Sequence, residues 1–491
     1  MRKSNILKGT SGDALLLTGV KFMTVALGFV VTRLLSQYLS LHDYGTYSQI
    51  LLLVSTVSSL TILGMIDGVN YYYCSESDPD KRDGYVATLF ALQGIASLVA
   101  GAVVLLLTGP ISAGFDNPDI RNLMIFAAAL PMLQNLMNML QVLLVSVGKA
   151  KILALRNLLV STARLAVALV MVWLVRNVAV ILMATLVLDA LQVLLFAVIL
   201  RKNSCRIRLS RVNLRLVGQI LQYCIPMAMF IMMRSVNRDL DKYMVGLWTD
   251  TETLAVYTNA SKPLPFDIIL HSFVTVLAPK ITRLVAAGEK EKASRLYQGM
   301  LELGCLTTVI PCLAALAAAP QLMELLYSDK YISGLSVFCL YILVDLLQFA
   351  NITMVLCAAG KTGTLMLVGI GTLGFNGALN GLLYWAMGIA GPALATLITT
   401  LISCLLIMGL SAKALGTKLR GLFDWKFLPV FLGANLLAVV LLQTLQWCLV
   451  GWGWQYILIL ALVAALYAGA FFVLFRQRIK RNITIVNQSE N

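Results

Sequence analysis

Fourteen apolar runs, each of the order of twenty residues or longer, follow one another from residue 12 to residue 475. An α-helix needs roughly 20 apolar residues to cross the ~30 Å hydrocarbon core of a bilayer. Runs of this length favour helices over the short alternating strands of a membrane barrel. The sequence therefore predicts an all-α polytopic membrane protein with about 14 transmembrane helices. The expected spans are 12–38, 46–70, 86–108, 121–147, 152–175, 178–200, 217–247, 254–284, 297–319, 333–359, 363–386, 389–411, 425–449 and 453–475.

Composition supports the same class of protein. Of the residues, 59% are hydrophobic and only 12% are charged, far from the balance of a soluble domain. The basic start "MRKSNILKG" precedes an apolar segment that is too long for a signal-peptide core and has no small-residue cleavage site. We therefore read that segment as the first span.

The net charge of +15 follows the positive-inside rule and does not indicate nucleic-acid binding. An even number of spans places both termini on one side of the membrane, and that side collects roughly 27 of the 38 Lys and Arg residues. The other side has about three, Arg121, Arg176 and Lys330. We therefore expect a multi-pass protein of the bacterial cytoplasmic membrane with both termini in the cytoplasm.

Cysteine and histidine usage points to neither disulfides nor a metal site. The nine cysteines are scattered singly, without a C-x-x-C pair, and the two histidines are His42 and His271. No catalytic motif and no cofactor site is expected.

An internal repeat organises the chain. The segments "VSVGKAKILAL" (145–155) and "CAAGKTGTLML" (357–367) both place Gly-Lys in a short inner loop, at an offset of 212 residues, and Trp173 meets Trp385 at the same offset. That offset corresponds to six spans, so two lobes of equal orientation are predicted. The expected domains are an N-lobe (1–200), a basic cytoplasmic linker (201–216), a C-lobe (217–411), and two further spans with a tail (412–491). Two such lobes around a central cavity are typical of transporters.

The stretch "MMRSVNRDLDKYMVG" (232–246) carries five charges inside an expected span, namely Arg234, Arg238, Asp239, Asp241 and Lys242. At 100° per residue all of them except Asp239 fall within about 100° of one helix face. A charge at bilayer depth costs roughly 2.5–3.5 kcal/mol, so the stripe should face a wet or protein-lined interior. The alternative is that the cations only pair with the two aspartates, and that the outer end of the stripe snorkels to the surface.

Cations also occur in the first lobe. Lys21 and Arg33 lie in span 1 and Arg164 lies near the middle of span 5, whereas Asp67 and Asp189 are the acids available there. Spans 1 and 7 occupy equivalent places in the two lobes. Cations on both therefore indicate a cavity that receives an anion.

Span 8 contains "SKPLPFDIILH", in which Pro263 and Pro265 should bend or break the helix. Asp267 and His271 then share a face, which would suit a coupling-ion or proton site. The alternative is a kinked helix with a buried His–Asp hydrogen bond. Asp67 and Asp345 are further lone carboxylates, candidates for ion coupling or for a structural role.

Five stretches resemble the polysaccharide and O-antigen flippases, the Wzx-like branch of the multidrug/oligosaccharidyl-lipid/polysaccharide (MOP) superfamily. They are "TRLLSQYLSLHDYGTYS", "YCIPMAMFIMMRSVNRDLDKYMVGLWTDTETLAVYTNASKP", the two "GK" turns, and "FNGALNGLLYWAMGIAGPALATLIT". The resemblance covers nearly the whole chain and specifies the family far better than the substrate.

This resemblance implies two six-helix lobes like those of MATE exporters and lipid II flippases, alternating access, and translocation of an undecaprenyl-pyrophosphate-linked oligosaccharide. Arg33, Arg234 and Arg238 match positions of cavity cations in the family. Helix position alone adds Lys21 and Arg164 to the expected pyrophosphate site, and the charged stripe adds Lys242. The implied partners are the bilayer, the lipid-linked donor and polysaccharide assembly proteins, for a chain that acts as a monomer. The driving ion, sodium or proton, stays open, and a MATE-like exporter or a lipid II-type flippase are the alternatives.

Overall fold

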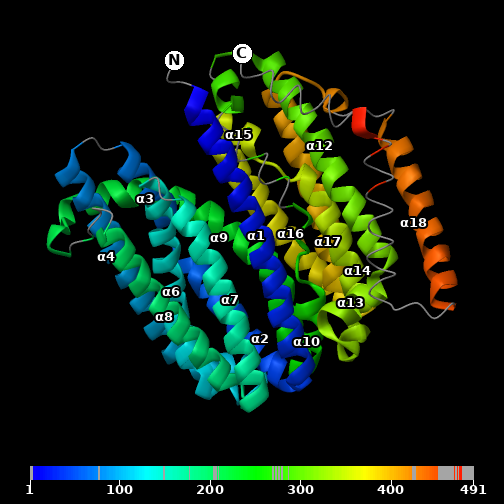
Figure 1. Ribbon diagram of the computed structural model, residues 1–491, viewed down its shortest axis with the longest axis horizontal. Coiled ribbons are helices and arrows are strands. Elements are labelled where there is room, and N and C mark those ends of the chain that lie inside the picture. The colour runs from blue at the N-terminus through cyan, green and yellow to red at the C-terminus, as the bar shows by residue number, and fades with distance from the viewer. Residues whose placement is uncertain are drawn as a thin grey trace. The chain divides into compact units, whose positions relative to one another are not determined.

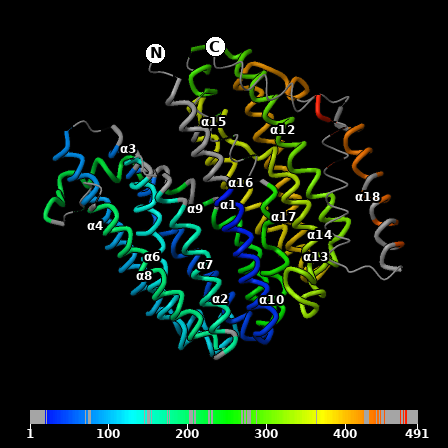
Figure 2. The backbone as a smooth tube through the Cα atoms, viewed as in Figure 1, coloured from blue at the N-terminus to red at the C-terminus, as the bar shows by residue number. Residues whose placement is uncertain are grey.

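The computed structural model describes residues 4–75, 78–147, 150–175, 177–202, 207, 209–267, 280–285, 287–422 and 427–451, with a few single positions between 270 and 277 and between 469 and 477. Every regular element in these ranges is a helix, which confirms the all-α fold class. The chain forms two compact units (Figures 1 and 2). Unit 1 comprises 1–258 and 326–330, and unit 2 comprises 259–325 and 331–491.

The described residues of unit 1 form ten α-helices. They are α1 (Ser4–Tyr38), α2 (Leu41–Thr61), α3 (Met65–Ser75), α4 (Pro79–Leu106), α5 (Thr108–Gly114), α6 (Ile120–Ser146), α7 (Ala150–Leu174), α8 (Val178–Lys202), α9 (Val217–Trp248) and α10 (Thr251–Ala260), whose last residues belong to unit 2. Helix α1 packs along α7, and α6 packs against α2, α4 and α8 (Figure 1). A buried apolar cluster joins α3, α4, α6, α8 and α9 through side chains such as Val69, Leu89, Leu143 and Phe196.

Unit 2 contains a second set of helices. They are α12 (Lys290–Ala317), α13 (Ala319–Tyr327, its end in unit 1), α14 (Leu335–Leu347), α15 (Met354–Ala358), α16 (Thr362–Met387), α17 (Ala390–Ala414) and α18 (Phe427–Gly451). Helix α17 packs against α14 and α16, and α12 packs against α14 and α18. The core of this unit gathers around Tyr297, Met300 and Val355, all of which are fully buried.

Seven of the described helices are long and apolar enough to cross a membrane. They lie within Pro79–Leu106, Ile120–Leu144, Val178–Arg201, Lys290–Ala317, Asp329–Ala358, Gly363–Met387 and Ala390–Ala414. Each coincides with an expected span. The total of fourteen stays a prediction, because most of span 453–475 lies outside the described residues.

Among the described residues, three expected spans are not continuous helices. In span 333–359, α14 ends at Leu347, a 3-10 turn follows at Gln348–Ala350, and α15 begins at Met354. Span 46–70 is divided into α2 and α3 at Leu63 and Gly64, whose φ angles are +43° and +67°. Hydropathy cannot reveal this break, because both residues suit an apolar run while the backbone takes the left-handed conformation. In span 254–284, α10 ends at Ala260 and a 3-10 turn covers Pro265–Asp267, which confirms the break predicted from the two prolines.

The boundary between the two units falls after Thr258, so α9 packs with unit 1 and the basic segment 201–216 is not the boundary. The division into two units shows which helices pack together, and it does not show which helices of the two predicted lobes correspond to one another. The two six-span lobes and their linker therefore stay a prediction. The second "GK" turn is a left-handed turn at Gly360 (φ +69°), whereas the first, at 148–149, lies outside the described residues.

Candidate functional site

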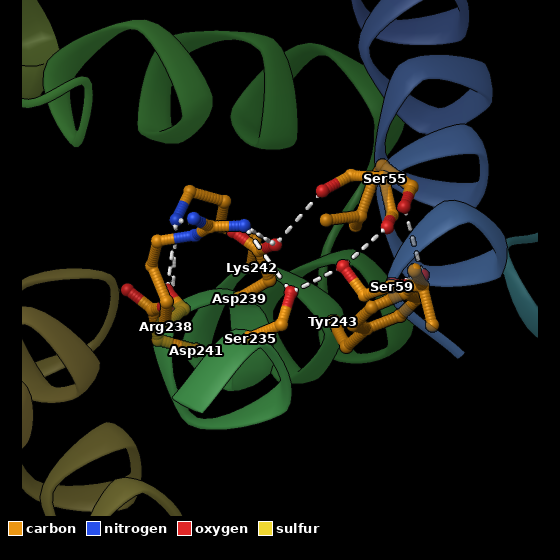
Figure 3. A network of polar contacts seen from close by, with 10 residues as sticks. Ser55, Ser59, Ser235, Arg238, Asp239, Asp241, Lys242 and Tyr243 are labelled. Atoms are coloured by element: carbon orange, nitrogen blue, oxygen red, sulfur yellow. Dashed lines mark hydrogen bonds and ion pairs between the residues drawn. The ribbon is translucent and has the colours of Figure 1, made fainter. Parts of the chain in front are cut away.

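The charged stretch of α9 forms a polar network with α2 (Figure 3). Asp239, nearly buried, stands at its centre. Its Oδ2 accepts hydrogen bonds from Arg238 Nη2 at 3.3 Å and from Ser55 Oγ at 3.2 Å, and its Oδ1 lies 3.3 Å from Lys242 Nζ. Asp239, which helical periodicity places to the side of the charged face, therefore links Arg238 and Lys242 to α2.

Lys242 is held between two carboxylates. Besides Asp239, its Nζ lies 3.8 Å from Asp241 Oδ1. Asp241 is fully buried and accepts a hydrogen bond of 2.7 Å from the hydroxyl of Tyr257 on α10. Only 12% of the Lys242 side chain is exposed. Lys242 therefore has two carboxylate partners within the unit, and its role as a phosphate ligand stays a prediction.

Arg238 differs from Lys242. Its side chain is 62% exposed, and the hydrogen bonds of its Nη2, 3.2 Å to Ser235 Oγ and 3.3 Å to Asp239 Oδ2, are long for a charge-assisted contact. Asp239 also accepts from Lys242, so its charge is shared between two cations. Arg238 is therefore the described cation of this network with most room to meet an incoming anion.

Hydroxyl groups complete the contact between α2 and α9, and sequence reasoning missed them. Ser59 and Ser235 lie with their Oγ atoms 2.6 Å apart, and the hydroxyl of Tyr243 donates to Thr56 Oγ1 at 2.6 Å. The available signal was the spacing of Ser55 and Ser59, which puts two hydroxyls on one face of an apolar helix.

A second charge cluster lies on α7 and α8 of unit 1. Arg164 Nη2 donates to Asp189 Oδ1 at 2.6 Å, and Gln192 Nε2 reaches the same oxygen at 3.1 Å. Asp189 is fully buried, and 44% of the Arg164 side chain is exposed. Arg156 is buried, donates to Gln192 Oε1, and lies over the ring of Phe196 at 4.5 Å. The structure therefore gives Arg164 a carboxylate partner inside the unit.

The remaining predicted residues are placed as follows. Arg33 is half-buried on α1, and its carbonyl oxygen accepts a hydrogen bond from Ser36 Oγ at 3.0 Å. Asp345 is buried on α14 and accepts the backbone N–H of Leu264 at 2.8 Å, so it stabilises the chain at the proline break. For four predicted residues the structure describes the backbone but not the side chain: Lys21, Asp67, Arg234 and Asp267. His271 lies outside the described residues.

The long apolar helices define an all-α polytopic membrane protein. The sequence profile of the polysaccharide biosynthesis protein family matches residues 30–335. The chain belongs to this family. A search of curated proteins found no match.

Solved structures share the fold. The lipid II flippase MurJ in an inward closed conformation has a TM-score of 0.68 at 13% identity, over 95% of this chain and 100% of MurJ. An inward-facing multidrug resistance MATE family transporter of the MOP superfamily has a TM-score of 0.60 at 15% identity, over 82% of this chain and 98% of the transporter. A MOP superfamily transporter from Pyrococcus furiosus is described as having a binding pocket of reverse polarity. It has a TM-score of 0.55 at 15% identity, over 82% of this chain and 95% of the transporter.

Proposed function

We propose that this protein is a flippase that carries polyprenyl-pyrophosphate-linked oligosaccharide units across the cytoplasmic membrane by alternating access, for the synthesis of a cell-surface polysaccharide. The family match to polysaccharide biosynthesis proteins and the fold shared with MurJ and the MATE transporters support a transporter of this class. Among the described residues, the exposed guanidinium of Arg238 is the observation that carries the choice of an anionic lipid-linked substrate.

The chemistry of the α9 network suits a pyrophosphate. A guanidinium presents several N–H donors in a planar fork that matches phosphate oxygens. Arg234 lies four residues before Arg238 on α9, about 6 Å along the helix and close to the same face, so its guanidinium is proposed as a second fork. Asp239 meets Arg238 at 3.3 Å, and Lys242 can keep the charge of Asp239 compensated when Arg238 turns to the substrate. Lys21, Arg33 and Arg164 are proposed as further ligands.

The test compares Arg238→Ala, Arg238→Lys and the double variant Arg238→Gln, Asp239→Asn, with complementation of a flippase-deficient strain as the measurement. If Arg238 binds phosphate, the alanine variant should lose at least about tenfold, since hydrogen bonds to charged groups contribute about 1.5–3 kcal/mol. The lysine variant should keep partial activity because it retains the charge without the fork. The matched control is Arg295→Ala, which removes another exposed arginine, 73% against 62% for Arg238, that is paired with Glu291 on α12.

The double variant separates the two roles of Arg238. If the arginine only balances Asp239, replacing both with neutral side chains should preserve transport, because a charge pair can be exchanged at little cost when both partners go. Continued loss of transport in a folded double variant supports phosphate binding. Full transport activity of the double variant Arg234→Ala, Arg238→Ala would overturn the proposal and favour the MATE-like exporter.

A further inference from the structure

Tyrosine side chains from three helices gather at one end of unit 1. We name as the tyrosine cluster Tyr71 and Tyr72 of α3, Tyr85 of α4 and Tyr223 of α9. The rings of Tyr71 and Tyr223 are stacked, with centroids 4.4 Å apart and planes 16° from parallel. Tyr72 and Tyr85 form a second stacked pair at 4.3 Å and 13°, and Tyr72 meets Tyr223 edge to face at 5.8 Å. The four aromatic rings thus form one connected cluster, in which each stacked ring keeps one face that its stacking partner does not cover.

A close helix crossing holds this cluster in place. A Cβ atom at Gly64 would lie 2.5 Å from the carbonyl oxygen of Cys224, and one at Gly68 would lie 2.8 Å from the Cys224 sulfur. Two glycines four residues apart let α3 approach α9 this closely. Tyr71 follows Gly68 by one turn, and Tyr223 directly precedes Cys224. The same crossing therefore brings the two stacked rings together.

Hydrogen bonds orient the inner pair of rings. The hydroxyl of Tyr72 donates to the backbone oxygen of Gln219 at 3.0 Å, and that of Tyr85 donates to Gln219 Oε1 at 2.8 Å. Tyr71 and Tyr223 remain outermost, with 46% and 38% of their surface exposed. The cluster therefore combines exposed ring surface with the polar groups of Gln219 and the tyrosine hydroxyls.

We infer that the tyrosine cluster binds pyranose rings of the oligosaccharide head group of the lipid-linked substrate. This inference rests on the proposed function. The C–H groups on one face of a pyranose carry partial positive charge and pack on the negative face of an aromatic ring, while sugar hydroxyls need hydrogen-bonding groups beside that ring. The tyrosine cluster has both the aromatic faces and the neighbouring hydrogen-bonding groups. Burial of such aromatic surface is a common source of ligand affinity.

The position of the cluster on α9 is compatible with an oligosaccharide that extends from a pyrophosphate at Arg238. Tyr223 and Arg238 are fifteen residues apart on the same helix. This corresponds to about 22 Å along an α-helix and to a rotation of only about 60°, so both side chains belong to one side of α9. A pyrophosphate at Arg238 would then direct a chain of several sugar rings toward Tyr223. By the predicted topology, the cluster lies toward the cytoplasmic end of α9, from which the substrate is taken up.

The alternative to a saccharide site is an aromatic belt that anchors the protein at the membrane interface. Anchoring requires only that aromatic rings lie at the level of the lipid head groups. It does not require rings from three helices that stack on one another and hydrogen-bond to a shared glutamine. The two readings also differ in which ligand the exposed rings would contact, so a direct binding measurement separates them.

The experiment measures saturation-transfer difference NMR between the full chain in nanodiscs and three lipid-free, neutral trisaccharides, of glucose, galactose and N-acetylglucosamine. The wild type should give a saturation signal with at least one of them. The double variant Tyr71→Ala, Tyr223→Ala should lower that signal at least about fivefold. The double variant Tyr71→Phe, Tyr223→Phe should retain most of the signal because the ring faces remain. Trp385→Ala, which removes an 89% exposed aromatic ring elsewhere, is the control and should leave the signal unchanged.

A parallel transport assay keeps this inference separate from the proposed phosphate site. Arg238→Ala should keep the trisaccharide signal and lose transport, whereas the double alanine variant of the tyrosines should lose both. No signal from the wild type, or an undiminished signal from a folded double alanine variant, overturns the saccharide site whatever Arg238 does. If the tyrosine results hold but Arg238→Ala transports normally, only the phosphate site fails.

Discussion

At the scale of single residues, the pair formed by Arg164 and Asp189 raises the question of what a half-exposed arginine contributes. Asp189 is fully buried, and its second oxygen, Oδ2, has no hydrogen-bond partner within the described structure. A buried carboxylate without its cation is costly, whereas a half-exposed guanidinium can turn toward water. The two members of the pair should therefore respond differently to substitution.

Arg164→Ala should destabilise the protein by about 3 kcal/mol, the lower end of the range for breaking a buried pair, because it leaves Asp189 uncompensated. Asp189→Asn should cost less, and the double variant should recover most of the loss. Thermal unfolding in detergent measures all three. Transport by the stable double variant then decides the role of Arg164: normal transport shows that it only balances Asp189, and lost transport supports its place among the phosphate ligands.

At the scale of helices, Asp250 fixes the start of α10. Its Oδ1 accepts the backbone N–H of Thr253 at 2.6 Å, its Oδ2 accepts the Thr253 hydroxyl at 3.0 Å, and its carbonyl accepts the N–H of Leu254. This is the hydrogen bonding of a helix N-cap. Partial burial raises the pKa of Asp250, but the hydrogen bonds from Thr253 outweigh it and lower that pKa below its usual range.

Asp250→Ala should therefore lower the free energy of unfolding by about 1 kcal/mol, and Asp250→Asn by much less, because asparagine can also cap a helix. Since the folded-state pKa is lowered, the charge-dependent part of this stabilisation is present above the pKa of the unfolded chain. It is lost as the pH falls through the lowered pKa of the folded state. Unfolding curves of the three proteins, recorded from neutral to acid pH, measure the effect. An alanine variant as stable as the wild type at neutral pH would contradict the capping role.

At the scale of the whole molecule, the membrane class and many of the helices could be predicted from sequence because each depends on local hydropathy. Long-range pairing could not. Nothing near Asp239 in the sequence indicates that its partner would be Ser55, 184 residues away on α2. The tyrosine cluster had a visible signal, three consecutive tyrosines at 71–73, but only the crossing of α3 and α9 shows that Tyr223 completes it.

The predicted orientation in the membrane depends on charge alone and can be tested directly. Glu252 and Arg215 are both exposed, and the positive-inside rule places Glu252 outside the cell and Arg215 in the cytoplasm. In a background without native cysteines, Glu252→Cys should react with an impermeant thiol reagent in intact cells. Arg215→Cys should react only after permeabilisation. Labelling of Arg215→Cys in intact cells would reverse the orientation, and it would move the tyrosine cluster away from the side on which a flippase takes up its substrate.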